Sequence, residues 1–346
     1  MFPFSSVKVF STTGSEVLAS EVCESLKPRL PDQLIPGGEL VLSRSNVQRF
    51  SNQNIQVQVD NVRGHFVVVI HTQVPPVNDG LIELFALLDA INNARPADVL
   101  LVFPYMPYVR SDRKNKPRIS TMAHRLAHIL SVSFEIKRVI LLDPHDSHIK
   151  HYFNPVADEI SAIYLMINYL EREFFNTVQK KDSVVVFSDP GSATRYKTVA
   201  YLLGLPTAYV EKDRPDDSEK PKFSKIVGDV KGKHCLLIDD EILTGSTAIG
   251  DAEILKSEGA VSVSMLAVHP ILRDKELTQA QLIEKLDRSL IERFIVTNSI
   301  PQEPGIFSSR FTVLSIAPFL GEAIKRSIVG QSLTELHKLE SVKLYR

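Results

Sequence analysis

The sequence predicts an α/β protein of about two domains, with mostly parallel sheets flanked by helices. Short runs rich in β-branched residues alternate along the whole chain with segments that are apolar at positions i, i+3, i+4 and i+7. This alternation is typical of parallel strands joined by helices. With 346 residues, of which 44% are hydrophobic and 23% charged, the chain is long enough for about two globular domains.

Nine short apolar runs are predicted to be strands. They are residues 7–10, 65–70, 98–103, 138–143, 183–189, 207–212, 234–240, 262–268 and 293–298. Helical periodicity is predicted between most of them, as over 79–94 and 193–205. A long helical segment over 159–181 separates two series of strands, which favours a domain boundary near 160–182. Residues 214–223 combine two prolines with charges of both signs, and they are predicted to be a mobile loop.

The charge balance argues against nucleic acids and membranes as partners. The formal net charge is −1, so a basic site must be local. No apolar stretch approaches the 18 residues of a membrane-spanning helix, and the first residues do not have the pattern of a signal peptide. We therefore expect a cytoplasmic protein.

Residues 236–256 contain the most informative arrangement of polar groups. Asp239 and Asp240 end an apolar strand, and a turn rich in hydroxyl groups leads into helical periodicity. The hydroxyls are those of Thr244, Ser246 and Thr247. Hydroxyls and backbone N–H groups at a helix N-terminus suit a phosphate, whereas the carboxylates suit sugar hydroxyls or a divalent cation. This pattern predicts a sugar-phosphate site, although an acidic turn that caps an ordinary helix would look the same.

Two further strands are predicted to end in acidic or imidazole groups at the same edge of one sheet. The strand at 138–143 leads into Asp143, His145, Asp146 and His148, and the strand at 183–189 ends at Asp189. The carboxyl ends of parallel strands are where open α/β sheets place their ligands. A lone histidine at such a position is more often a hydrogen-bonded structural residue.

Two groups of cations also follow predicted strands. Arg110, Arg113, Lys114, Lys116 and Arg118 lie within nine positions, where Arg side chains suit the oxygens of a polyphosphate. Lys212 and Arg214 begin the predicted mobile loop. Cations on a loop that closes over a site suit phosphoryl transfer.

Seven stretches taken together resemble the ribose-phosphate pyrophosphokinase, or PRPP synthetase, family. They are residues 50–70, 78–91, 103–120, 143–153, 211–215, 238–247 and 296–302, and the similarity runs in order from about residue 7 to about residue 335. The resemblance implies two similar phosphoribosyltransferase-type domains, each a mostly parallel sheet flanked by helices. The N-terminal pyrophosphokinase domain would span 1–162 and be completed by the C-terminal helix over 317–346, and the second domain would span 163–316.

The resemblance implies an enzyme, an ATP-dependent diphosphotransferase. With Mg2+, such an enzyme transfers the β,γ-pyrophosphate of ATP to the C1 hydroxyl of ribose 5-phosphate and yields PRPP and AMP. It also implies a homo-oligomer based on dimers, commonly a hexamer.

The resemblance assigns roles to individual residues. Lys212, Arg214 and His145 would be catalytic, and His145 and Asp189 would be metal ligands. ATP would be bound by Phe50, Asn52, Asn54, Arg110, Ser111, Asp112, Lys114 and His145, with Phe50 and Asn52 reaching the adenine of a neighbouring subunit. Ribose phosphate would be bound by Asp189, Asp239, Asp240, Thr244, Gly245, Ser246 and Thr247.

The chain departs from the family pattern at several positions. Asn54 stands where the family has Glu, Ser111 where it has Gln, and Leu243 where it has a third Asp. The turn after Ser188 also differs, with Pro190 and Ser192 beside Asp189. These departures concern nucleotide and acceptor binding more than the type of reaction.

Four functions are compatible with these observations. The first is PRPP synthetase. The second keeps the same chemistry on a larger acceptor that ends in ribose 5-phosphate, such as ADP-ribose, and is motivated by Leu243 and the altered turn. The third is a catalytically silent regulatory subunit, disfavoured by the presence of His145, Asp189, Lys212 and Arg214. The fourth, a phosphoribosyltransferase that consumes PRPP, does not explain the basic segment after residue 103.

Overall fold

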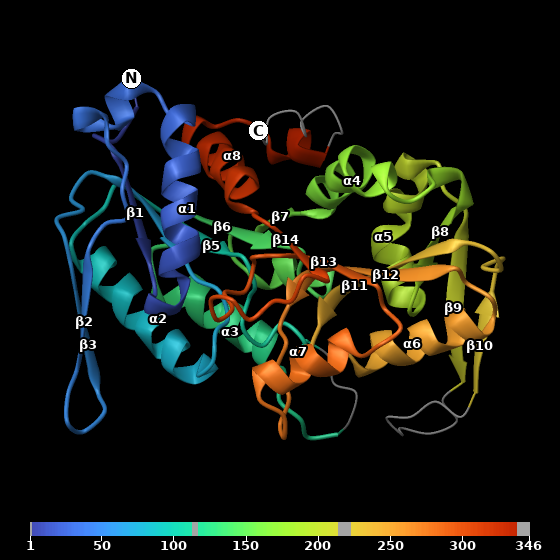
Figure 1. Ribbon diagram of the computed structural model, residues 1–346. Helices are drawn as coiled ribbons and strands as arrows, with labels where there is room; N and C mark the ends of the chain where they lie inside the picture. The colour runs from blue at the N-terminus through green and yellow to red at the C-terminus, as the bar shows by residue number, and fades with distance from the viewer. Residues whose placement is uncertain (1, 113–116, 214–222, 338–346) are drawn as a thin grey trace. The chain divides into compact units, whose positions relative to one another are not determined.

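The computed structural model describes residues 2–112, 117–213 and 223–337 and confirms the predicted α/β class (Figure 1). The chain divides into two compact units. Unit 1 comprises Met1–Ala162, Ser299–Pro301 and Ile316–Arg346, and unit 2 comprises Ile163–Asn298 and Gln302–Ser315. Each unit has its own mostly parallel sheet with flanking helices.

Unit 1 is built on a parallel sheet whose strand order is β1-β4-β5-β6-β7. The strands are β1 (Val7–Ser11), β4 (Phe66–Ile70), β5 (Asp98–Phe103), β6 (Arg138–Leu142) and β7 (Asp158–Ile160). The helices are α1 (Glu16–Leu26), α2 (Val77–Asn93), α3 (Met122–Ser133) and α8 (Ala317–Val329). Every residue of β4 is buried. Because successive side chains of a strand point to opposite faces, both faces of this central strand are covered.

A separate antiparallel hairpin in unit 1 was not among the predicted strands. It consists of β2 (Ser45–Arg49) and β3 (Ile55–Val59), and β3 packs against α2. Half-buried and exposed residues alternate along β3, which is the period of a strand with one covered face. Its Ile-Gln-Val-Gln-Val sequence carried this signal, but it is less apolar than the other strands.

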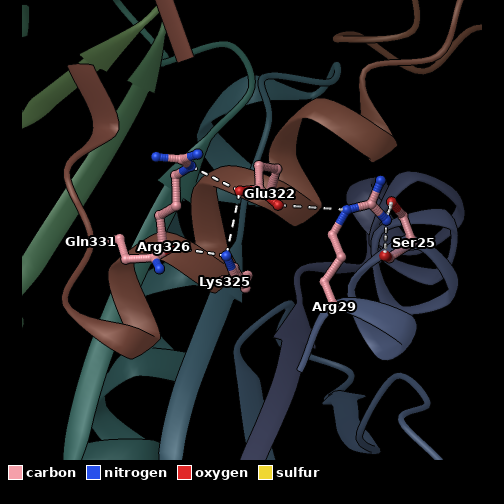
Figure 2. A network of polar contacts seen from close by, with 6 residues as sticks. All are labelled: Ser25, Arg29, Glu322, Lys325, Arg326 and Gln331. Atoms are coloured by element: carbon pink, nitrogen blue, oxygen red, sulfur yellow. Dashed lines mark hydrogen bonds and ion pairs between the residues drawn. The ribbon is translucent and has the colours of Figure 1, made fainter. Parts of the chain in front are cut away.

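Helix α8 packs alongside α1, although the two helices are about 300 residues apart in sequence (Figure 1). The helices approach closely at Gly321, where an added Cβ would lie 2.9 Å from the Ser25 Oγ. Buried Glu322 of α8 is surrounded by cations (Figure 2). Its carboxylate lies 3.8 Å from Arg29 Nε, 3.6 Å from Lys325 Nζ and 2.8 Å from Arg326 Nε.

The cations around Glu322 also donate to neutral acceptors (Figure 2). The Arg29 guanidinium donates to Ser25, and Lys325 Nζ donates to Gln331 Oε1 at 2.8 Å. Arg326 Nη1 donates to the Ser332 carbonyl at 2.9 Å. These contacts, which we call the Glu322 network, fasten α8 and the segment after it to α1.

Unit 2 contains a larger sheet with the strand order β10-β9-β8-β11-β12-β13-β14, in which only the β9–β10 pair is antiparallel among the described strands. The strands are β8 (Ser183–Phe187), β9 (Thr207–Asp213), β10 (Phe223–Val227), β11 (His234–Ile242), β12 (Ser262–Pro270), β13 (Arg293–Thr297) and β14 (Phe311–Leu314). The helices are α4 (Ile163–Arg172), α5 (Pro190–Leu203), α6 (Ser246–Ser257) and α7 (Gln279–Asp287).

Helices α6 and α7 cover one face of the unit 2 sheet. Ala252 and Leu255 of α6 and Leu282 of α7 share an apolar core with Val186 of β8 and Leu237 of β11. Helix α5 packs against β8 and β11 as well, and every residue of β8 is buried. The central strands of unit 2 are therefore also covered on both faces.

Two expectations about the framework are wrong. The predicted long helix over 159–181 ends at Arg172, and the 3-10 turns Phe174–Asn176 and Lys180–Asp182 follow it. The three acidic strand ends do not share one sheet, because β6 belongs to the unit 1 sheet whereas β8 and β11 belong to the unit 2 sheet. Periodicity identifies strands but does not say which sheet they join.

None of the helices in the described ranges combines the length and the apolar character that crossing a bilayer demands.

Candidate functional site

The polar site in unit 2 lies where the strand order reverses direction. From β8 the chain passes through α5 to β9 on one side, whereas β11 pairs with β8 on the other side and leads on to β12 and β13. Such a switch point leaves a crevice beyond the carboxyl ends of the two adjacent strands, and ligands of open α/β sheets bind there. Asp189 follows β8, and Asp239 and Asp240 lie near the end of β11.

The two aspartates of β11 lie within the strand rather than in the turn. β11 continues to Ile242, and Asp239 and Glu241 pair with residues of β12. Asp240 is buried, whereas Asp239 is half-buried. Burial, the neighbouring Asp240 carboxyl and the charge of Asp189 together raise the pKa of Asp239 well above its usual range. Asp189 and Asp240 therefore both act electrostatically on Asp239, and we call the three residues the acidic corner.

Arg195 of α5 is a member of this site that the sequence did not reveal. Its Nη1 lies 2.7 Å from Asp240 Oδ2, with side-chain exposures of 22% and 5% respectively. Burial by itself would lower the pKa of Arg195, but the Asp240 charge outweighs it and the pKa lies above its usual value. Arg195 and Asp240 are distant in sequence, and the sole local hint was a cation six positions after Asp189.

The turn from β11 to α6 has the geometry of an anion cradle. Gly245 precedes α6 with φ +70°, and an added Cβ there would lie 2.4 Å from Leu286 Cδ2. A side chain at position 245 would therefore be strained in this backbone conformation and would require the Leu286 side chain to shift. Thr244 Oγ1 donates to Ser246 Oγ at 3.2 Å, and Ser246 and Thr247 are exposed at the helix N-terminus.

Lys285 of α7 also reaches this turn and was not predicted. Its Nζ donates to Ser246 Oγ at 3.0 Å. A cation at the N-terminus of a helix is unfavourable by itself, because that end of the helix carries a partial positive charge. An anion between Lys285 and the first turn of α6 would be attracted by both.

Asp189 has a structural contact in addition to its predicted role. It is the N-cap of α5, and its Oδ1 accepts from the Ser192 backbone N–H at 2.8 Å in a reciprocal capping box. Asp189 is exposed and lines a cavity of about 750 Å3 between the first turn of α5 and the β9–β10 pair. The unusual Ser192 therefore completes the cap that orients Asp189.

The candidate cations after β9 are partly outside the described residues. The backbone of Lys212 lies within β9, which continues one residue further than predicted and pairs Lys212 with Ser224 of β10. Arg214 and most of the predicted mobile loop lie outside the described residues, as does Lys114 of the basic segment.

In unit 1, the candidate ATP residues occupy three loops. Phe50, Asn52 and Asn54 form the exposed turn of the β2–β3 hairpin. The Phe50 N–H donates to the Asn54 carbonyl at 2.8 Å, and Asn52 Oδ1 accepts from the Asn54 N–H at 3.1 Å. Asn54 therefore closes the turn through its backbone, which does not depend on its side chain.

Arg110, Ser111 and Asp112 follow β5 in the second loop. Arg110 is exposed, and Ser111 and Asp112 are half-buried. Ser111 Oγ donates to the Ser120 carbonyl and accepts from the Met122 N–H, both at 3.2 Å. Ser111 thus ties together the two ends of the basic segment.

The third loop follows β6 and contains His145, which is half-buried. Its neighbours have structural roles. Buried Asp143 accepts from Ser161 Oγ at 2.5 Å and from the Ala162 N–H at 2.7 Å, which joins the end of β6 to that of β7. Asp146 caps the 3-10 turn Ser147–Tyr152 by accepting from the His148 N–H at 2.8 Å. Asp143 and Asp146 thus both have local structural partners.

Two family models match separate parts of the chain. A family model described as the N-terminal domain of ribose phosphate pyrophosphokinase matches residues 7–133. A second model, described as a phosphoribosyl synthetase-associated domain, matches residues 210–338.

Full-length relatives are similar along nearly the entire chain. The ribose-phosphate pyrophosphokinase of Aquifex aeolicus is 32% identical over 95% of this chain and 98% of its own. That of Caldanaerobacter subterraneus is 34% identical over 96% of this chain and 98% of its own. The crystal structure of phosphoribosylpyrophosphate synthetase from Mycobacterium smegmatis is 28% identical, with a TM-score of 0.82 over 94% of this chain and 99% of its own. The chain therefore belongs to the ribose-phosphate pyrophosphokinase (PRPP synthetase) family.

Proposed function

We propose that this protein is a ribose-phosphate pyrophosphokinase. It would transfer the β,γ-diphosphoryl group of Mg-ATP to the C1 hydroxyl of ribose 5-phosphate and release PRPP and AMP. The observation that carries the proposal is the pairing, within unit 2, of the acidic corner with the cradle at residues 244–247 and Lys285. A sugar phosphate has hydroxyl groups that suit the carboxylates of the acidic corner. It also has a phosphate dianion that suits the donors of the cradle.

The cradle would hold the 5-phosphate of the acceptor. Backbone N–H groups of the first turn of α6, the hydroxyls of Thr244, Ser246 and Thr247, and the Lys285 ammonium all offer donors. The close packing of Gly245 against Leu286 keeps the turn in one conformation. A rigid anchor at the phosphate end reduces the freedom of the sugar at the reacting end.

The acidic corner would orient the ribose. Carboxylate oxygens of Asp239 and Asp240 accept hydrogen bonds from the ring hydroxyls, so that the C1 oxygen faces the β phosphorus of ATP for in-line attack. This role is an orientation effect rather than proton transfer. The bond from the C1 oxygen to the β phosphorus forms as the bond between the α,β-bridging oxygen and the β phosphorus breaks. AMP leaves, and the proton of the C1 hydroxyl is released to water.

The donor set fits a magnesium ion. Asp189 presents a carboxylate at the crevice, and burial together with the neighbouring carboxyl groups raises the pKa of Asp239, so a cation there would be favourable. His145 would hold the Mg2+ of Mg-ATP, and Asp189 would hold a second Mg2+ or contact the sugar. Mg2+ would neutralise phosphate charge and polarise the β phosphorus.

The candidate cations would act on the ATP side. Lys212 and Arg214 would offset charge on the transferring group, and Arg110 and Lys114, with Asp112 nearby, would position the polyphosphate. Phe50, Asn52 and Asn54 lie at an exposed hairpin turn. If they contact the nucleotide of a neighbouring subunit, as proposed, the active form is a homo-oligomer.

A second candidate function keeps this chemistry but uses a larger acceptor that ends in ribose 5-phosphate, such as ADP-ribose. Leu243 favours it, because an apolar side chain that is 38% exposed lies directly beside the phosphate cradle. The backbone carbonyl of Leu243 accepts from the Arg273 N–H at 3.1 Å, so the loop after β12 borders the same place. An acceptor extended from its phosphate would pass these residues.

Mass-spectrometric analysis of products distinguishes these functions. The purified protein is incubated with Mg-ATP and either ribose 5-phosphate, ADP-ribose or no acceptor. PRPP with equimolar AMP in the first mixture alone supports the proposal, whereas a pyrophosphorylated ADP-ribose supports the second candidate. Absence of AMP in all three mixtures would overturn both and favour a catalytically silent subunit.

A further inference from the structure

The Arg195–Asp240 ion pair connects two adjacent strand ends of the unit 2 site, which a purely structural ion pair does not require. Asp240 belongs to β11, which carries two of the three residues of the acidic corner, and Arg195 comes from α5, whose N-cap is the third, Asp189. The guanidinium therefore joins the helix that begins at one strand end to the carboxylate at the adjacent strand end. The side chain bridges both sides of the switch point.

The pair is short and mostly removed from solvent, so its geometry is well defined. An Arg–carboxylate contact of 2.7 Å is a charge-assisted hydrogen bond with directional preference. Asp240 also lies next to Asp239, whose Oδ1 accepts from the Asp240 backbone N–H at 3.0 Å. Without a cation, repulsion from the neighbouring carboxyl groups would tend to turn the Asp240 side chain away from them.

We propose that Arg195 is a positioning residue for the acceptor sugar, acting through Asp240. By holding Asp240 Oδ2, the guanidinium fixes the orientation of the Asp240 carboxylate near the end of β11. The inference rests on the proposed function, because it assigns the acidic corner to the ribose hydroxyls. Arg195 itself is not placed in contact with the substrate.

A double-mutant cycle tests this role. Turnover and the KM values for acceptor and ATP are measured for the wild type, Arg195→Met, Asp240→Asn and the double variant, with Arg195→Lys as the conservative variant. Arg172→Met, which removes an exposed Arg at the end of α4, is the matched control. Circular dichroism and thermal melts establish that each variant is folded.

We expect Arg195→Met to lower kcat/KM for the acceptor by about 100-fold, since a misplacement of about 1 Å in an orienting group has that effect. The KM for ATP should change by less than about twofold, and Arg195→Lys should recover part of the loss. In the Asp240→Asn background, Arg195→Met should have almost no additional effect, because residues that act as a unit are not additive. The inference would be overturned if kcat/KM fell equally for ATP and for the acceptor. It would also be overturned if the effects of Arg195→Met and Asp240→Asn were additive in the double variant.

Crystal structures of the wild type and Arg195→Met, determined at one pH, provide a readout that does not depend on activity. The Asp240 carboxylate should be displaced by about 1 Å or rotated in the variant. An unchanged carboxylate would reject the positioning role even if the wild type makes no PRPP. If the carboxylate moves but no acceptor reacts, the proposed function fails while the positioning of Asp240 by Arg195 stands.

Discussion

The acidic corner of unit 2 and the Glu322 network of unit 1 both contain buried carboxylates, but their charges are arranged in opposite ways. Glu322 is approached by three cations whose remaining donors reach carbonyl and amide oxygens. The corner gathers three carboxyl groups, of which Asp240 is paired with Arg195 at 2.7 Å. In the Glu322 network, cations of the protein balance the charge of the carboxylate. In the acidic corner, three carboxyl groups lie close together beside an open crevice.

The difference indicates how to separate a structural cluster of charges from a functional one. Breaking a mostly buried ion pair leaves an uncompensated charge and is destabilising. Crowded like charges destabilise the folded state, and such an arrangement is typical of a binding site that is completed by a cation or by hydroxyl donors. The network should therefore be needed for stability and the corner for activity.

The strongest test of this contrast is Asp239→Asn. We expect turnover with ribose 5-phosphate to fall by about 100-fold, because an orienting carboxylate is lost. The free energy of unfolding should stay the same or increase, because repulsion within the corner is relieved. Steady-state kinetics measures the turnover, and urea unfolding measures the free energy of unfolding. A large loss of stability would make Asp239 a structural residue.

The converse test is Glu322→Gln. The free energy of unfolding should fall by about 2 kcal/mol, since three partly buried cations lose their counter-ion. Turnover should be within about twofold of the wild type, because Glu322 belongs to no candidate site. Glu284→Gln, which removes an exposed ion pair with Arg288, is the control and should change stability by less than about 0.5 kcal/mol. A loss of activity without a loss of stability would reverse the assignment.

A smaller effect is expected at the positive side of the unit 2 site. Lys285→Ala should raise the KM for ribose 5-phosphate by about tenfold, which corresponds to the loss of one hydrogen bond from a charged donor. Turnover at saturation should change little, because the 5-phosphate does not react. Lys181→Ala, at an exposed position, serves as the control. An unchanged KM would remove Lys285 from the cradle.

The smallest expected effect is a dependence of stability on pH. The pKa of Asp239 is raised in the folded protein, so the folded state binds more protons than the unfolded state once the pH exceeds the ordinary Asp value of 3.8. The destabilising contribution is absent below that value and grows as the pH rises towards the raised pKa. The advantage of Asp239→Asn over the wild type in urea unfolding should therefore increase with pH. A difference that is constant with pH would show that the pKa of Asp239 is not raised in the folded protein.

The sequence by itself determined the α/β class, nine of the strands and the polar strand ends. These depend on local patterns, namely the period of apolar residues and the polar residues that follow each run. The turn at residues 244–247 could be found in the same way, because a strand, a hydroxyl-rich turn and a helix are consecutive in the chain.

Only the tertiary structure decided which strand ends share a sheet and which cations meet which acids. β6 and β11 end in similar acidic sequences but belong to different sheets. Arg195 and Asp240, and likewise Lys285 and Ser246, are brought together by the packing of α5 and α7 around the switch point. The Glu322 network depends equally on α8 packing against α1. A local pattern does not specify these long-range partners, because they follow from how complete elements pack.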